Sequence, residues 1–127
     1  MPEFETPLIA EVYDQLQQAM AADRAGFTEL YRDYLADAWQ TLQRLRDAVR
    51  QQHREEICAK AHYLKSSSLV LGAHRVARHA ARLEETARNS DIDEDALGRI
   101  ADALREVQAE LAIRLGGEVL PAGRTAA

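Results

Sequence analysis

The stretch from Phe27 to Leu71 contains neither glycine nor proline, although the whole chain has 6 and 3 of them. Because these two residues mark most turns, their absence over such a length favours long helices over a turn-rich β fold. The first half of the stretch carries apolar residues at the i, i+3, i+4 spacing of one helix face for about six turns. These residues are Phe27, Leu30, Tyr31, Tyr34, Leu35, Ala38, Leu42, Leu45 and Val49.

The same periodicity, read with helix start and stop signals, predicts five helices. A short first helix starts at Thr6-Pro7, a hydroxyl N-cap followed by proline at the first helical position, and runs to about Met20. The other four are expected at roughly Arg24 to Gln51, Arg54 to Gly72, Ala73 to Arg88, and from an N-cap at Asp91 or Asp93 to Gly116-Gly117.

These helices predict the fold class and the domain organisation. The 127 residues suffice for one domain with a modest core and not for two. Short connections between long helices make neighbours antiparallel. We therefore expect an all-α fold, an up-down antiparallel four-helix bundle with an additional short N-terminal helix, over residues 1–117. Residues 118–127 show no apolar period, and we expect a disordered tail there.

Charge and composition exclude several classes of function. The formal net charge of −5 argues against a general nucleic-acid role, which needs a basic face. Cys58 is the only cysteine, so neither an internal disulfide nor a multi-cysteine metal site can form. No apolar run approaches the roughly 18 residues of a membrane span, and residues 1–6 lack the apolar core of a signal peptide. We therefore expect a cytoplasmic protein. We also expect it to be a monomer.

The candidate chemistry lies on the expected third helix. On a helical wheel of about 100° per residue, His62 points roughly 140° away from the apolar direction and faces solvent. An imidazole held in water titrates near physiological pH and can act as a nucleophile. The apolar direction is defined by Ile57, Ala61, Leu64, Ser68 and Leu71.

The other three histidines are better interpreted as surface or core residues without a function. His53 falls in an expected connection between helices. His74 and His79 are five residues apart, off the one-turn spacing of a metal site, and have no thiol nearby. We expect no metal ligands and no bound cofactor in this chain.

The neighbours of His62 fit phosphoryl chemistry. Lys65 lies at its flank and is one of only two lysines in a chain that otherwise uses arginine, which weakens its interpretation as a solvated helix residue. An ammonium group there would attract phosphoryl oxygens. The run Ser66-Ser67-Ser68 is a poor choice for helix stability, but a small residue at Ser66 lets another protein approach the imidazole. Leu69 is either part of a docking surface or an incidental exposed leucine, and Cys58 shares its side.

At these residues the sequence resembles the histidine-containing phosphotransfer (HPt) domains of bacterial phosphorelays. The family pattern is alanine-histidine-x-leucine-lysine-glycine-serine-serine, followed by glycine-alanine. The chain has Ala61-His62-Tyr63-Leu64-Lys65-Ser66-Ser67-Ser68 and then Gly72-Ala73. The pair Leu83-Glu84 also looks like the family, and the resemblance covers roughly Leu8 to Leu115.

The resemblance implies a phosphocarrier that is not an ATP-using enzyme. His62 would accept a phosphoryl group from a receiver-domain aspartate and pass it to another, within a relay linking a hybrid histidine kinase to a response regulator. Lys65 would pair with the phosphoryl group, Tyr63 and Leu69 would line the docking surface, and the receiver would supply Mg²⁺. Ser66 replaces the usual glycine, and its hydroxyl would bond either the imidazole or the backbone carbonyl of His62.

Two alternatives remain open. One is a helical adaptor that binds a receiver or a histidine kinase without accepting phosphate. An autonomous kinase is disfavoured because no Gly-rich ATP-binding region is present.

The other alternative concerns Arg75 and Arg78, which form a basic stripe with Arg82. The stripe is either a solvated face or a surface that steers an acidic receiver pocket toward His62.

Overall fold

The structure is a computed structural model of the chain and describes residues 6–89 and 91–117. Within this part the chain forms five helices and no strand, which confirms the all-α prediction. The helices are α1 (Ala10–Ala19), α2 (Arg24–Arg50), α3 (Arg54–Val70), α4 (His74–Asn89) and α5 (Asp95–Leu115). None of these helices combines the length and the apolar character that crossing a bilayer requires. The predicted tail, residues 118–127, lies outside the described residues.

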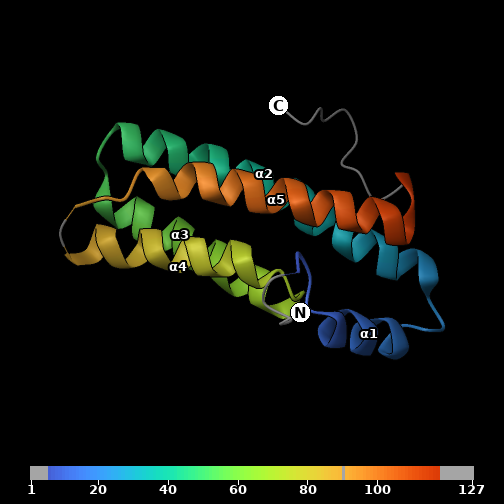
Figure 1. Ribbon diagram of the computed structural model, residues 1–127. Helices are drawn as coiled ribbons and strands as arrows, with labels where there is room; N and C mark the ends of the chain where they lie inside the picture. Colours follow the sequence, from blue (N-terminus) through green and yellow to red (C-terminus); the bar gives the residue numbers. More distant parts are fainter. Residues whose placement is uncertain (1–5, 90, 118–127) are drawn as a thin grey trace.

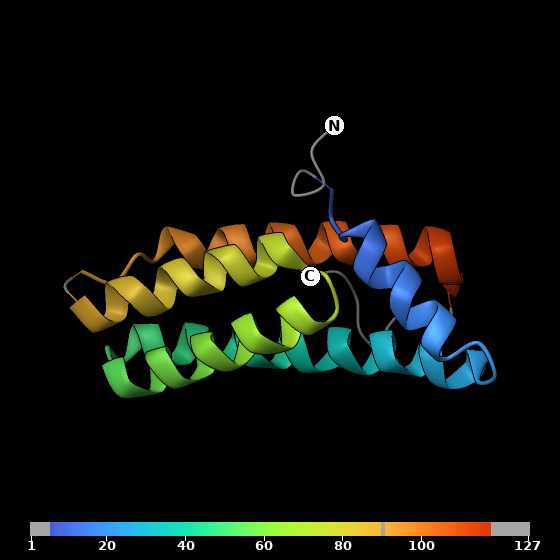
Figure 2. The same cartoon turned by 90° about the horizontal axis from the view of Figure 1, so that it is seen from below.

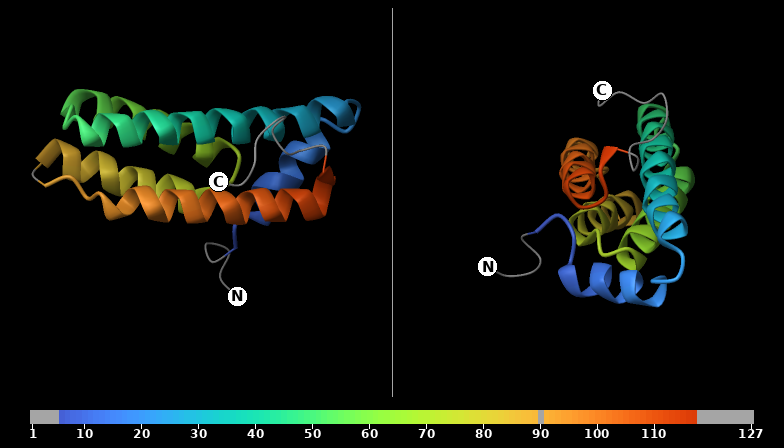
Figure 3. Two further views of the ribbon diagram at one scale, coloured as in Figure 1. Left: turned by 90° about the horizontal axis from the view of Figure 1, so that it is seen from above. Right: turned by 90° about the vertical axis from the view of Figure 1, so that its right-hand side faces the viewer.

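Helices α2 to α5 form the predicted up-down bundle (Figure 1). Each packs on the next in chain order, and α5 closes the ring by packing on α2, so that α3 and α5 are diagonal neighbours. Helices α2 and α5 are longer than α3 and α4 and extend past the α3–α4 turn. The short helix α1 lies across the bundle at that end (Figures 2 and 3).

The α3–α4 turn joins α1 to the bundle. Gly72 ends α3 with a φ of +83°, a left-handed conformation that favours glycine. A Cβ atom at this position would lie 3.1 Å from Cβ of Val12 on α1, so glycine also permits the close approach. The backbone N–H of Ile9 donates to the carbonyl of Gly72 over 3.0 Å.

The predicted start of the first helix is wrong. Helix α1 begins at Ala10 with Ile9 as its N-cap and no side-chain capping bond. The Thr6 hydroxyl donates to the carbonyl of Leu8, and Thr6 is not the N-cap of α1. Because Leu8 is buried in the core and Ile9 bonds to Gly72, tertiary contacts keep this segment out of the helix until Ala10.

The cap of α5 also differs from the prediction. The N-cap position is Glu94, which makes no side-chain capping bond. The Asp93 carboxylate accepts a backbone N–H from Asp95, but it also binds Arg82 and Arg99 and lies one residue too early to be the N-cap. By contrast, the predicted start of α2 at Arg24 is confirmed, since Asp23 caps that helix by accepting from the N–H of Gly26.

Two buried hydrogen bonds of hydroxyl groups fix α3 against α2. Tyr34 on α2 and Ser68 on α3 share a hydrogen bond of 2.7 Å within the core. The Tyr31 hydroxyl donates to the carbonyl of Leu71 at the end of α3 over 3.0 Å. With Leu64 also fully buried, these contacts set the rotation of α3 and therefore which of its side chains reach solvent.

Candidate functional site

The His62 imidazole projects from α3 into solvent, as the helical wheel predicts. Its side chain is 59% exposed, and Nδ1 lies 3.1 Å from Oε2 of Glu84 on α4. An ionised carboxylate only accepts hydrogen bonds, so this contact places the ring proton of the neutral imidazole on Nδ1. The Nε2 lone pair is then left available for chemistry.

Glu84 is the centre of the charged contacts around this histidine. It lies on the inner side of α4 and is only 9% exposed. Its carboxylate binds Nζ of Lys65 at 3.2 Å and Nη2 of Arg88 at 2.8 Å, in addition to His62. Burial alone would raise the pKa of Glu84, but the hydrogen bond and charge of Lys65, together with His62, hold that pKa below its ordinary value. Glu84 therefore stays ionised and holds its partners in place.

An open groove of about 580 Å³ lies beside His62, between α3 and α4. Four cationic side chains and two carboxylates line it, so the lining carries an excess of positive charge. A concave surface of this sign suits a phosphoryl group, whose oxygens accept charge-assisted hydrogen bonds. The charged lining residues are Lys65, Arg78, Arg82, Arg88, Glu84 and Glu85.

The residues expected to surround His62 on α3 are found at the surface or near it. Tyr63 and Leu69 are exposed, and the Tyr63 hydroxyl donates to Asp37 on α2 over 2.6 Å. Ser66 is exposed, and within the described residues its hydroxyl bonds neither the imidazole nor the carbonyl of His62. Cys58 is half-buried, with Sγ 3.8 Å from the carbonyl oxygen of Glu84.

Arg75 and Arg78, the two candidate docking residues of the basic stripe, lie at different places. Arg78 is exposed and lines the groove beside His62. Arg75 lies between α4 and α5, where it forms an ion pair of 2.6 Å with Glu106. The structure therefore brings Arg78, but not Arg75, together with the histidine.

Sequence reasoning gave no role to Glu84 or to Arg88. A signal for Glu84 was present, because it follows Ala80 by one turn on the apolar face of the fourth helix. A carboxylate at a core-facing position needs a partner, which indicates a cation or a histidine on the facing helix. Arg88 lies four residues after Glu84, at the i, i+4 spacing at which opposite charges pair on a helix, so the spacing indicates their ion pair.

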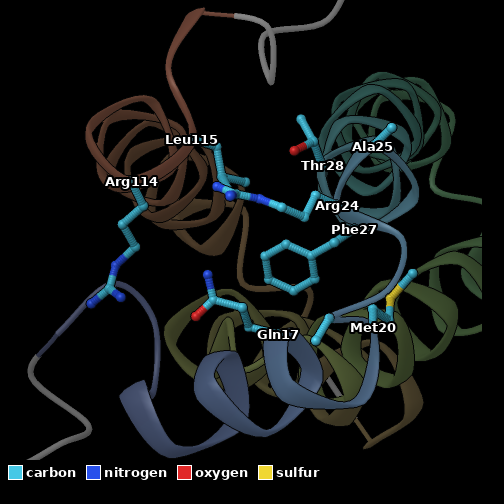
Figure 4. A pocket seen from close by; sticks show the side chains of 9 residues that line it. Gln17, Met20, Arg24, Ala25, Phe27, Thr28, Arg114 and Leu115 are labelled. Carbon is cyan, nitrogen blue, oxygen red and sulfur yellow. The ribbon is translucent and has the colours of Figure 1, made fainter.

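A second pocket lies at the end of the bundle where α1 crosses (Figure 4). It has a volume of about 560 Å³ and is lined by the C-terminal end of α1, the first turns of α2 and the last residues of α5. Phe27 and Met20 contribute apolar walls, and Arg24 and Arg114 contribute charge. None of the residues predicted for the phosphoryl site lines this pocket. The pocket is therefore not part of that site, although the two have similar volumes.

A family model of the Hpt domain matches residues 29–110, which include α3, α4 and the His62–Glu84 pair. The chain belongs to the Hpt domain family. Hpt domains are histidine phosphotransfer domains of phosphorelays; they carry phosphoryl groups rather than acting as kinases, and they interact with receiver domains. The predicted family resemblance is thereby confirmed.

The same fold is found in a solved structure. The crystal structure of histidine-containing phosphotransfer protein B from Pseudomonas aeruginosa PAO1 matches with a TM-score of 0.78 and 21% sequence identity. The match covers 84% of this chain and 92% of that one. No curated protein sequence matches this Hpt domain.

Proposed function

We propose that this Hpt domain relays a phosphoryl group between receiver-domain aspartates, with Nε2 of His62 as the acceptor atom. One observation carries the proposal: the His62 ring is exposed while its Nδ1 is bound to the carboxylate of Glu84. A histidine arranged in this way presents a single nucleophilic nitrogen to an approaching partner.

The transfer step conserves atoms and charge. The Nε2 lone pair attacks the phosphorus of an aspartyl phosphate, the N–P bond forms, and the P–O bond to the aspartate breaks. The electron pair of that bond leaves with the aspartate as a carboxylate. Because the ring keeps its Nδ1 proton, it becomes positively charged, and Glu84 stabilises that charge at 3.1 Å. The reverse step passes the group to a second aspartate.

In this proposal the cations beside His62 also interact with the phosphoryl group and with the receiver. Lys65 binds Glu84 over 3.2 Å and remains 29% exposed, so its ammonium group reaches the groove where phosphoryl oxygens would lie. Arg78 is exposed at the same groove and is suited to attract an acidic pocket. Mg²⁺ for the aspartyl phosphate would come from the receiver, and a hybrid histidine kinase and a response regulator would supply the receivers.

The test is transfer of radiolabel from phosphorylated receiver domains to purified variants. We expect label on the wild type and on His53→Ala, a matched control at another exposed histidine, and none on His62→Ala. The label should be acid-labile, as expected for a phosphorylated imidazole. Label on His62→Ala at the wild-type level would refute the assignment.

His62→Gln distinguishes the relay from a phosphate-independent adaptor. A variant that still binds the receiver but loses both label and signalling supports the relay. Signalling that persists at the wild-type level without label would instead support the adaptor.

A further inference from the structure

A groove between α4 and α5 is lined almost entirely by ionisable side chains. It has a volume of about 500 Å³, and α4 separates it from the groove beside His62, which lies between α3 and α4. Ala103 is its only apolar lining residue. The complete lining is Arg75, Arg78, His79, Arg99, Asp102, Ala103 and Glu106.

His79 is a half-buried residue of this groove on which three arginine charges act. Burial lowers the pKa of its imidazole, and the charges of Arg78, Arg99 and Arg75 lower that pKa further. Asp93, just before α5, has the opposite effect without cancelling the others. Guanidinium groups from α4 and α5 therefore surround an imidazole that is neutral at physiological pH.

The arginines differ in how far carboxylates already neutralise them. Arg75 is bound to Glu106 over 2.6 Å. Arg99 reaches Asp93 at 3.4 Å, and that carboxylate is shared with a second arginine. Arg78 is exposed, and within residues 6–89 and 91–117 it forms no ion pair. Arg78 and Arg99 therefore have N–H donors to offer to an anion, and the guanidinium fork matches the oxygens of a phosphate.

Both carboxylates in the lining already have cationic partners. Glu106 binds Arg75, and Asp102 binds Arg105, which lies outside the lining, over 2.9 Å. The charge that remains in the groove is positive. With Ala103 as the only apolar residue, the groove has no wall that would contact a nucleobase or an acyl chain. These features suit a small, multiply charged anion that is recognised by charge and hydrogen bonds alone.

We propose that the α4–α5 groove binds a small anion of the phosphate class, such as inorganic pyrophosphate or the terminal phosphates of a larger metabolite, held by Arg78 and Arg99 beside His79. Arg78 is the one residue that lines both this groove and the groove beside His62. An anion bound to Arg78 removes a cation that attracts the acidic pocket of the receiver. Occupancy therefore weakens receiver docking at His62. This consequence, unlike the binding itself, rests on the proposed function.

Binding is tested first, without any phosphotransfer. Inorganic pyrophosphate is titrated into the protein at constant ionic strength, and NMR follows the imidazole of His79. We expect the pKa of His79 to rise toward its ordinary value, because a bound anion stabilises the protonated ring. Arg78→Gln and Arg99→Gln should each weaken binding roughly tenfold. Arg44→Gln is the matched control, since it removes the same charge at an exposed side chain on α2, the helix diagonal to α4, and it should bind as the wild type does.

A comparison of three anions tests what the groove recognises. Pyrophosphate should bind more tightly than inorganic phosphate, which carries fewer charges. ADP should bind no more tightly than pyrophosphate, because the groove gives its base and ribose no apolar contact. Much tighter binding of ADP would overturn recognition by charge alone.

The coupling to His62 is tested by the apparent KM for a phosphorylated receiver, with pyrophosphate at about three times its dissociation constant for the wild type. Free Mg²⁺ is held fixed because pyrophosphate binds this ion. We expect the KM of the wild type to rise about threefold, which is the rise expected if the occupied form docks tenfold more weakly. The KM of Arg99→Gln should change little, since Arg99 lines only the α4–α5 groove.

Three results distinguish the possible failures. Equal pyrophosphate affinities for the wild type and for Arg78→Gln combined with Arg99→Gln would overturn the site, because the binding would then be general screening of charge. An equal rise of KM in the wild type and in Arg99→Gln would overturn the coupling. If no receiver transfers to the wild type while His79 still responds to pyrophosphate, the proposed function fails and the anion site stands.

Discussion

Replacement of Glu84 gives the sharpest test of the phosphoryl site. When Nε2 carries a phosphoryl group and Nδ1 keeps its proton, the ring charge lies 3.1 Å from the Glu84 carboxylate. Coulomb's law gives about 1.3 kcal/mol at that distance in water and about 5 kcal/mol at an effective dielectric constant near 20. Because His62 is 59% exposed, the contribution should lie toward the lower end, about 1.5–3 kcal/mol for a charge-assisted hydrogen bond. That range corresponds to a roughly 10- to 150-fold loss in the rate of phosphorylation.

Glu84→Gln keeps the size of the side chain and removes its charge, so we expect a loss of roughly tenfold. Glu84→Ala also removes the hydrogen-bond acceptor, so its loss in the rate of phosphorylation should be larger. The assay is phosphorylation by phosphoramidate, which bypasses receiver docking, with ¹⁵N NMR of the imidazole to report the tautomer. Glu85→Gln is the control, since Glu85 is exposed and lines the same groove. A rate for Glu84→Gln equal to that of Glu85→Gln, with an unchanged tautomer, would refute the role of the carboxylate.

Four further outcomes are expected. Tyr34→Phe and Ser68→Ala should each destabilise the fold by about 1–3 kcal/mol, and the double variant by less than their sum, in urea denaturation; strict additivity would contradict the shared buried bond. Lys65→Ala should slow phosphotransfer and raise the pKa of Glu84 toward its ordinary value, as titration by NMR would report. Ser66→Gly should speed transfer from a receiver and cost about 0.5 kcal/mol of helix stability; a slower transfer would remove the idea that side-chain size limits access. Because the pKa of Glu84 is lowered in the fold, its stabilising effect should be complete above about pH 4.5 and decline as the pH falls through the folded pKa, a loss that Glu84→Gln should not show.

The helices and the outward direction of His62 were predictable because both depend on local periodicity. The spacing of apolar residues places α2 within one residue of its observed end at Arg50. The wheel of α3 separates Ala61 and Leu64, which are fully buried, from the exposed histidine. In these segments every local preference of the sequence agrees with the final packing. The apolar periodicity alone is therefore sufficient to predict the helix and its buried face.

The features that were missed depend on contacts between elements. Thr6-Pro7 has the composition of a helix start, but the hydrogen bond from Ile9 to Gly72 delays helix formation until Ala10. The role of Glu84 requires the register of α4 against α3, which brings its carboxylate to the His62 ring. No short stretch of the sequence specifies how α4 is aligned with α3. A carboxylate on an apolar face indicates only that a partner exists.

The serine run illustrates how one helix meets the demands of a core and of a functional surface at once. Successive residues of a helix are rotated by about 100°, so three adjacent serines face three environments. Ser68 enters the core and bonds Tyr34, Ser67 lies at the flank and donates to the carbonyl of Leu64, and Ser66 lies on the exposed side of the helix. Only Ser66 can affect the approach of a partner to His62. Substitutions along the run should therefore separate, with Ser68 altering stability and Ser66 altering transfer, even though the three residues are identical and consecutive.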